Sequence, residues 1–179
     1  MNNDLSTWVK KNKSPLAFVS KLLLIHLAFQ LTYDYVVVPY TKLDYWLINS
    51  IIDSSEGLLS LLGYSLIEKN QLYQYHMGIE GTNGIVIGNP CDGLSLFILF
   101  TAFLIVFKGK WWFKVIFIIG GVILIHFLNV VRVSALALIV KYAPDSLDFH
   151  HSYTFTLFVY VCIFLLWVLR VKIYQGKKI

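Results

Sequence analysis

Three kinds of reactive side chain stand beside long apolar stretches of this sequence, and the first is a thiol. Cys91 follows Pro90 and opens the apolar stretch 91–107. A helix that begins there would place its free N–H groups and the positive end of its dipole beside the sulfur, which favours the reactive thiolate. The alternative is a small, buried apolar cysteine, which is the usual state of a lone cysteine. We expect this inert state for Cys162, in the middle of another apolar stretch.

The second is a guanidinium inside the apolar sequence FLNVVRVSALALIV. At the centre of a spanning helix Arg132 would cost about 2.5–3.5 kcal/mol, and less near a helix end, so an interaction must offset this cost. As a functional group it would donate hydrogen bonds to an oxygen that gains negative charge, with Asn129 three residues earlier on the same helix face. The alternatives are a structural Arg132 that snorkels to the membrane surface or forms an ion pair with Asp148, and a hydrogen bond of Asn129 between helices.

The third is the pair His150 and His151, directly before the last apolar stretch. Near neutral pH an imidazole can take a proton from a thiol and return it to a leaving amine. Histidines at a membrane surface are also often merely solvated. His26 and His126, which lie inside apolar stretches, are interpreted as structural hydrogen-bonding groups.

These groups belong to a chain that is too apolar for a soluble domain. Of its 179 residues, 58% are hydrophobic and 14% are charged, against about 45–50% and 25% in ordinary soluble domains. A chain this short cannot bury the surplus, so the surplus must face lipid. This excludes a soluble globular domain, a disordered chain and a nucleic-acid-binding module. The sequence has no Cys/His cluster typical of a metal site, so we expect neither a metal nor a cofactor.

We therefore expect a single membrane domain over residues 1–179, an all-α integral membrane bundle with about four transmembrane helices. A helix that crosses the bilayer needs about 20 mostly apolar residues. The stretches that qualify are 16–38, 91–107, 113–140 and 153–171.

Basic residues in the short connections predict the orientation of the four spans, because lysine and arginine mark the cytoplasmic side. They occur before the first span, between the second and third, and after the fourth: Lys10, Lys11 and Lys13; Lys108, Lys110 and Lys114; Arg170, Lys172, Lys177 and Lys178. Both termini are then cytoplasmic, and the loops 39–90 and 141–151 lie outside.

The outer loop 39–90 contains two predicted elements. Residues 46–67 are apolar enough for a fifth span, but Asp53 and Glu56 would each cost a few kcal/mol at the bilayer centre. We favour a helix or helical pair that lies in the outer interface or packs on the bundle. The alternating residues 71–77 and the β-branched stretch 84–88, separated by turn-forming residues, predict a small β-hairpin.

The predicted topology places the three reactive groups on one face of the membrane. The start of the second span, the end of the third and the start of the fourth all lie outside, and they carry Cys91, Arg132 and the His150–His151 pair. A nucleophile, an oxyanion donor and a base at one surface are typical of a cysteine acyl-transfer site.

Three short motifs, in this order, resemble the exosortase/archaeosortase family of membrane transpeptidases. They are NPCDGL at 89–94, similar to the family's Cys-x-Gly-Leu box, NVVR at 129–132, similar to its Asn-x-x-Arg helix motif, and FHH at 149–151, in the place of its histidine before the final span. The resemblance covers roughly residues 60–170, and the short length and the sequence HHSYTF are most similar to the compact subgroup called exosortase F. The chain lacks the Gly-Trp that often follows the family's histidine.

The resemblance implies sorting of exported proteins at the outer face of the bacterial cytoplasmic membrane. Family substrates end in a tail with a short recognition motif, a hydrophobic helix and a basic end. The enzyme cuts near the motif and passes the acyl group to an acceptor. The partners implied are this tail and the lipid bilayer, and a membrane partner protein is left open.

The resemblance also assigns roles to residues of this sequence. Cys91 would attack the scissile carbonyl, Arg132 would stabilise the oxyanion, and a histidine would transfer the proton. We favour His151 for that role because it is nearer the span, with His150 as the alternative. The predicted hairpin could hold the extended motif by strand addition.

Two other functions fit the same composition. A small non-catalytic scaffold or assembly subunit would use Arg132 as an inter-helix residue and would not need Cys91. A transporter would be expected to show an internal repeat and paired broken helices, which this sequence lacks.

Overall fold

The computed structural model describes residues 13–68, 74–88 and 91–176, most of which are helical. Three helical segments in this part of the chain are long and apolar enough to cross a membrane: Pro15–Tyr40, Trp111–Tyr142 and Pro144–Gln175. They confirm the predicted multi-pass, helical membrane architecture, and they contain the predicted spans 16–38, 113–140 and 153–171.

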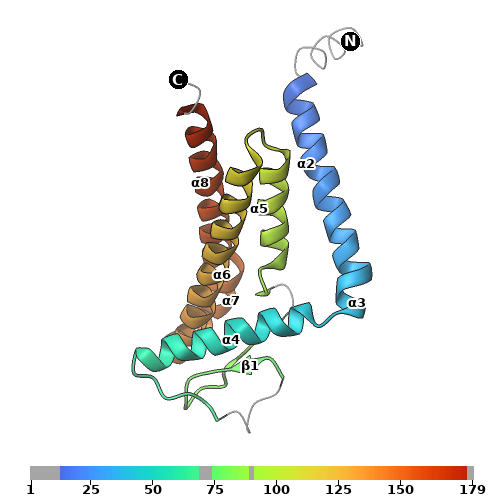
Figure 1. The fold of residues 1–179 in the computed structure, drawn as a ribbon. Coiled ribbons are helices and arrows are strands. Elements are labelled where there is room, and N and C mark those ends of the chain that lie inside the picture. Colours follow the sequence, from blue (N-terminus) through green and yellow to red (C-terminus); the bar gives the residue numbers. More distant parts are fainter. Residues whose placement is uncertain (1–12, 69–73, 89–90, 177–179) are drawn as a thin grey trace, which may run out of the picture.

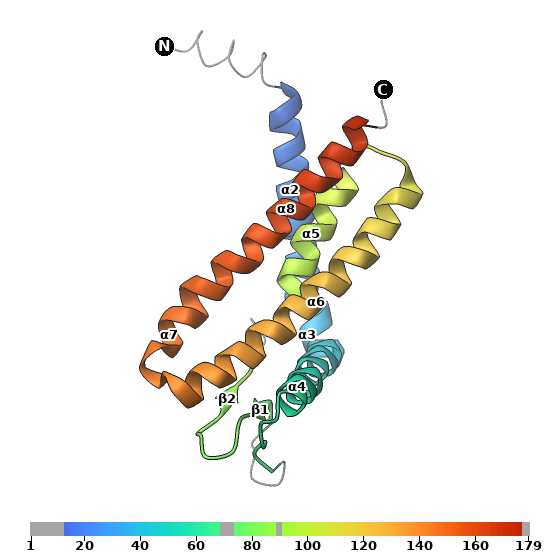
Figure 2. The ribbon, with the colours of Figure 1, turned by 90° about the vertical axis from the view of Figure 1, so that its left-hand side faces the viewer.

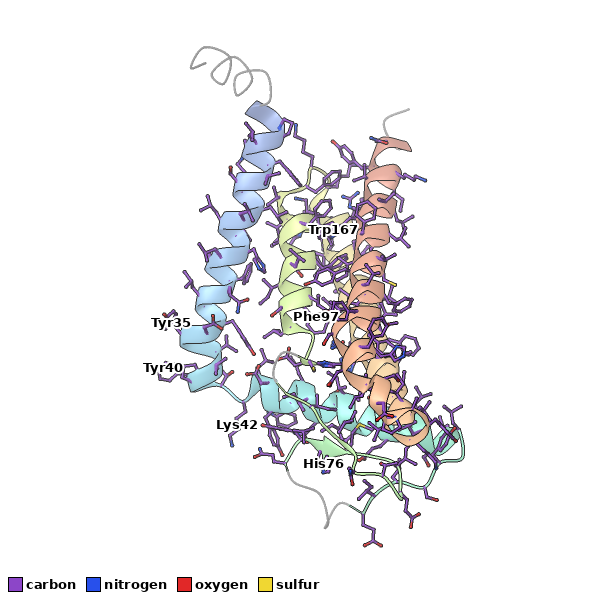
Figure 3. The ribbon with its side chains drawn as sticks, turned by 180° about the vertical axis from the view of Figure 1, so that it is seen from behind. Tyr35, Tyr40, Lys42, His76, Phe97 and Trp167 are labelled. Atoms are coloured by element: carbon purple, nitrogen blue, oxygen red, sulfur yellow. The ribbon has the colours of Figure 1, made fainter. Side chains whose placement is uncertain are left out.

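The first long segment runs without interruption through three helical elements. Helix α2 (Lys13–Thr32) continues through the π-helical turn η1 (Tyr33–Val37) into α3 (Val38–Tyr40). Tyr35 and Tyr40, at its far end, point away from the rest of the fold (Figure 3) and are 72% and 81% exposed. Aromatic residues of this kind are common where a spanning helix meets the membrane surface.

The predicted span 91–107 is present as a shorter helix, α5 (Leu94–Val106). Its 13 residues measure about 20 Å along the axis, whereas the hydrocarbon core of a bilayer is about 30 Å thick. Gly93, with φ of 81°, limits the helix at one end, and Phe107, with an extended backbone, limits it at the other. A count of four spans therefore does not follow from helix lengths alone.

The next helix, α6 (Trp111–Tyr142), has 32 residues and a length of about 48 Å, more than one crossing requires. The chain then turns through η4 (Pro144–Ser146), α7 (Leu147–Phe149) and the π-helical turn η5 (His150–Thr154) into α8 (Phe155–Gly176). In Figure 2, α6 and α8 run side by side along most of their length.

Aromatic side chains fill the space between α5, α6 and α8. Phe100 is fully buried, and the rings of Phe103 and Trp167 stack with their centroids 4.4 Å apart. Figure 3 shows Trp167 between α5 and α8. A Cβ atom at Gly121 of α6 would collide with the ring of Phe100, so α5 and α6 approach closely at this glycine.

Residues 43–61 form one helix, α4 (Leu43–Leu61), which lies across one end of the bundle rather than along it (Figure 1). Its buried side chains include Ile48 and Ile51, and Ser55 donates a hydrogen bond to the Val130 carbonyl of α6. The segment 46–67 is thus a single helix packed on α6, followed by a turn. It is not among the three candidate spans in the described residues.

Below α4 lies a two-stranded antiparallel sheet of β1 (His76–Met77) and β2 (Ile85–Val86), with His76 opposite Val86. Both strands fall inside the predicted ranges 71–77 and 84–88 but are shorter, and residues 69–73 lie outside the described part of the chain. Figure 2 shows β1 toward α4, and β2 toward the end of α6.

The basic connections lie at the end of the bundle opposite α4. The beginning of α2, the connection between α5 and α6, and the end of α8 share that end (Figure 1), which carries Lys108, Lys110 and Lys172. The predicted basic residues Lys10, Lys11, Lys177 and Lys178 lie outside the described residues. Among those described, Arg170 is buried between the rings of Phe107 and Phe117, with 5.6 and 5.7 Å to their centroids.

Candidate functional site

Cys91 lies between the sheet and α5, at the end of the bundle covered by α4. The prediction that it opens the helix is wrong by three residues, because α5 begins at Leu94. Asp92 accounts for the difference: its side-chain Oδ1 accepts a hydrogen bond from the Leu94 N–H at 2.7 Å. Gly93 then makes the left-handed turn into the helix, and Cys91 is held just before it.

His151 faces the sulfur of Cys91. Its Nε2 atom is 3.5 Å from Sγ, although the two residues are 60 positions apart. The turn after α6 brings His151 back to this position through η4, α7 and η5. His150, the alternative base, contacts Thr154 instead, with 3.1 Å between Nδ1 and Oγ1.

Arg132 also reaches the sulfur. Its Nη2 atom lies 3.9 Å from Cys91 Sγ and donates toward it from α6. Its Nε atom is buried and has no hydrogen-bond partner in the described part of the chain. Asp148, the ion-pair partner suggested by the sequence, lines the same cavity, but the hydrogen bond that Arg132 makes here goes to the sulfur.

Asn129 supports the backbone of the cysteine rather than its side chain. It is 1% exposed, and its Nδ2 donates to the Cys91 carbonyl at 3.4 Å. A Cβ atom at Gly93 would collide with this amide, so glycine is required at position 93 both for space and for its φ of 81°.

These groups open into a cavity of about 300 Å³. Cys91, Arg132, Asp148 and His151 form its polar part, and the remaining lining comes mainly from β2, α6 and α7: Gly84, Ile85, Val86, Ile87, Val133, Leu136 and Leu147. A mostly apolar hollow with a few convergent polar groups is the usual form of a small binding site. The three residues can together deliver a nucleophile, a proton acceptor and a positive charge to one bound carbonyl.

A second polar cluster includes Asp92, the residue after Cys91, and the sequence analysis did not identify it. The Tyr33 hydroxyl donates to Asp44 Oδ1 at 2.8 Å and lies 3.5 Å from Asp92 Oδ2. Burial raises the pKa of Asp92 to about 6, and the neighbouring charge of Asp44 acts in the same direction, while the hydrogen bond from Leu94 opposes them. Asp92, the acidic residue next to Cys91, is the one indication of this cluster in the sequence, because Tyr33 and Asp44 come from distant segments.

Two residues interpreted as structural lie away from the sulfur. His126 contacts Ser50 of α4, with 3.4 Å between Nε2 and Oγ. Cys162 is a half-buried free cysteine within α8. Neither lines the cavity at Cys91.

A comparison with known protein families gives a match over most of the chain. The model of a family described as transmembrane exosortases matches residues 15–168 of the chain. No curated protein and no solved structure matches it.

Proposed function

The chain belongs to the transmembrane exosortase family, a family of cysteine transpeptidases, and we propose that it cleaves the C-terminal sorting tails of exported proteins and transfers them to an acceptor. One observation carries this proposal. The Cys91 sulfur has an imidazole nitrogen at 3.5 Å and a guanidinium nitrogen at 3.9 Å, all at the edge of one cavity.

In the proposed reaction, His151 accepts the thiol proton while Cys91 Sγ bonds to the scissile carbonyl carbon. The tetrahedral intermediate collapses, the C–N bond breaks, and His151 returns the proton to the leaving amine. The retained part of the substrate is then a thioester on Cys91. An amine or hydroxyl of the acceptor attacks this thioester, and the thiol is regenerated.

Arg132 is the group proposed to stabilise the oxyanion. A guanidinium that already points at the sulfur is within reach of an oxygen on the carbon bonded to that sulfur, and its charge is most effective where water is excluded. The Nε atom of Arg132, which has no hydrogen-bond partner among the described residues, offers a second donor. Asn129 holds the cysteine backbone in place and is proposed as a positioning residue.

We also propose that the site faces the outside of a bacterial cytoplasmic membrane, with both termini in the cytoplasm. The basic connections and the site lie at opposite ends of the bundle, which supports this orientation. It requires α5 to cross the membrane as a fourth span. A short helix can do so where the bilayer thins locally or flanking lysines such as Lys108 and Lys110 extend to the surface.

The proposed substrate tail consists of a recognition motif, a hydrophobic helix and a basic end. The helix would lie among the spans and the motif would enter the cavity. Within the family, the short length of the chain and its HHSYTF sequence favour the compact exosortase F subgroup. A membrane partner protein could take part in presenting the tail.

The experiment is to follow tail removal in cells that express this chain together with an exported protein whose tail is encoded beside it. The unmodified enzyme should shorten the substrate, and Cys91→Ala should abolish shortening. Mass spectrometry of the enzyme should detect the acyl group on Cys91 when the acceptor is limiting.

Cys162→Ala is the matched control, because it removes the other cysteine of the chain and should leave processing unchanged. Normal processing by Cys91→Ala would end the catalytic proposal. A non-catalytic membrane scaffold would then be the better account of the fold.

A further inference from the structure

Strand β2 has one edge that its partner β1 does not use. In the register of the sheet, Val86 lies opposite His76 and Ile85 lies opposite Met77, and the Ile87 N–H donates to the Tyr75 carbonyl at 2.8 Å. Residues of an antiparallel strand alternate between those that bond to the partner and those that do not. Since Ile87 bonds toward β1, the N–H and C=O of Val86 point away from it.

This unused edge lies beside the candidate nucleophile. The cavity that contains Cys91 and His151 is also lined by the whole of β2, and Leu147 of α7 contributes to its wall. Strand β1 lies on the side of α4, so the opposite edge of β2 faces the end of α6 (Figure 2). Val86 is 69% exposed, so the described part of the chain leaves most of this residue uncovered.

We propose that this edge binds the substrate segment just before the scissile bond as an added strand, an inference that rests on the proposed function. The Val86 N–H would donate to a carbonyl of the substrate, and the Val86 C=O would accept an N–H from the same substrate residue. Strand addition of this kind uses the main chain for affinity and pockets for alternate side chains for specificity.

The lining of the cavity favours an extended peptide over other occupants. Backbone donors and acceptors at the spacing of a strand match a peptide chain, which also supplies the carbonyl that Cys91 would attack. The apolar side chains of Ile85, Val133 and Leu136 accept an apolar side chain of the substrate beside the sulfur. The sheet itself has two strands of two residues each, and a third strand would extend a ladder that is short on its own.

A specificity rule follows. The substrate residue that pairs with Val86 must keep its own N–H, so proline and N-methylated residues are excluded at that one position. Its neighbours, whose N–H groups point away from β2, tolerate the same change. We therefore expect one position of the recognition motif to be selected mainly through its backbone N–H, with a smaller contribution from its side chain.

The first test uses the full-length enzyme in detergent and a synthetic peptide copied from the tail that the cellular experiment identifies. Val86→Pro removes the outward N–H without touching the bonds to β1, whereas Val86→Ala removes the side chain and keeps the N–H. Because loss of a hydrogen bond corresponds to a change of about tenfold or less in affinity, we expect KM of the proline variant to exceed that of the alanine variant by about that factor, with kcat changed less.

The second test leaves the enzyme unmodified and places a single N-methyl group at each position of the peptide in turn. Cleavage should fall sharply at one position before the scissile bond and little at its two neighbours. If Val86→Pro does not fold, this scan still tests whether the substrate binds to β2 as an added strand.

Equal KM values for the two Val86 variants, together with a flat N-methyl scan, would overturn the strand-addition proposal. Cleavage that still depends on Cys91 would, in that case, leave the proposed function standing. Cleavage by Cys91→Ala would remove the proposed function itself, so the two failures are distinguishable.

Discussion

The Nε2 atom of His151 lies 3.5 Å from the Sγ atom of Cys91, and this contact joins the segment just before α5 to the turn before α8. The adjacent residue, His150, makes a different contact, to Thr154 within its own helical turn. Successive residues of a helical turn point in different directions, so the two adjacent histidines of η5 face different partners. The geometry therefore distinguishes two neighbouring histidines that the sequence does not.

This separation predicts opposite results for two alanine substitutions. His151→Ala should slow tail removal by about 10²–10⁴-fold, because a positioned general acid and base contributes that much to a transfer reaction. His150→Ala should stay within a few-fold of the unmodified enzyme. The measurement is the rate at which the substrate shortens in co-expressing cells, at matched enzyme levels. Equal losses in the two variants would contradict the assignment of the base to His151.

Asp92 predicts an unusual dependence of stability on pH. It precedes the first residue of α5, and burial raises its pKa from the ordinary 3.8 to about 6. Between these values the folded state binds more protons than the unfolded state, so the free energy of unfolding falls as the pH rises through this window and stays lower above it. Asp92→Asn removes the charge and keeps an oxygen for the Leu94 N–H. We expect it to be more stable than the unmodified protein at neutral pH, by about 1–3 kcal/mol.

Thermal unfolding in detergent at pH values of about 4 and about 7.5 measures this effect. The advantage of Asp92→Asn should be large at the higher pH and nearly absent at the lower one, where Asp92 of the folded protein is already neutral. Asp34→Asn is the control, because Asp34 is an exposed carboxylate of the same region. An advantage that does not change with pH would show that the charge of Asp92 is not the cause.

Much of the site was predictable because its residues stand out against an apolar background. Cys91, Arg132 and the histidine pair are reactive groups at the ends of long apolar stretches, and the alternation of basic connections predicts that these ends share one side. The prediction needed no knowledge of distances. The choice between His150 and His151 did need it, since a single π-helical turn decides which ring faces the sulfur.

Other features could not be predicted because they depend on contacts between distant segments. The hydrogen bonds that join Tyr33, Asp44 and Asp92 bring together three elements, and no local pattern connects them. The length of α5 could not be predicted either. Its apolar composition predicts a full span, but Gly93 and Phe107 end the helix after 13 residues. Composition predicts where a chain is apolar, and backbone conformation decides how much of it is helix.

The proposed orientation predicts which face of the membrane exposes Cys91. A membrane-impermeant maleimide should label Cys91 in intact spheroplasts, because the site is proposed to lie on the outer surface. Cys162 should stay unlabelled, because it lies inside α8, within the candidate membrane span Pro144–Gln175. Cys91→Ala should abolish the labelling, which identifies the residue. Labelling that appears only in inverted vesicles would reverse the proposed topology without affecting the geometry of the site.

Two adjacent glycines of α6 predict opposite effects on stability. A Cβ atom at Gly121 would collide with the Phe100 ring of α5, whereas a Cβ atom at Gly120 meets no other atom nearby. Both alanine substitutions gain about 0.8–1 kcal/mol of helix propensity, so Gly120→Ala should raise the unfolding temperature. Gly121→Ala should lower it, because overpacking at a tight contact costs about 1–3 kcal/mol.

Since α6 carries Arg132 and α5 follows Cys91, a displacement at Gly121 should also slow tail removal, while Gly120→Ala should process the substrate normally. Equal stability of the two variants in detergent would show that α5 and α6 do not pack at Gly121 as described.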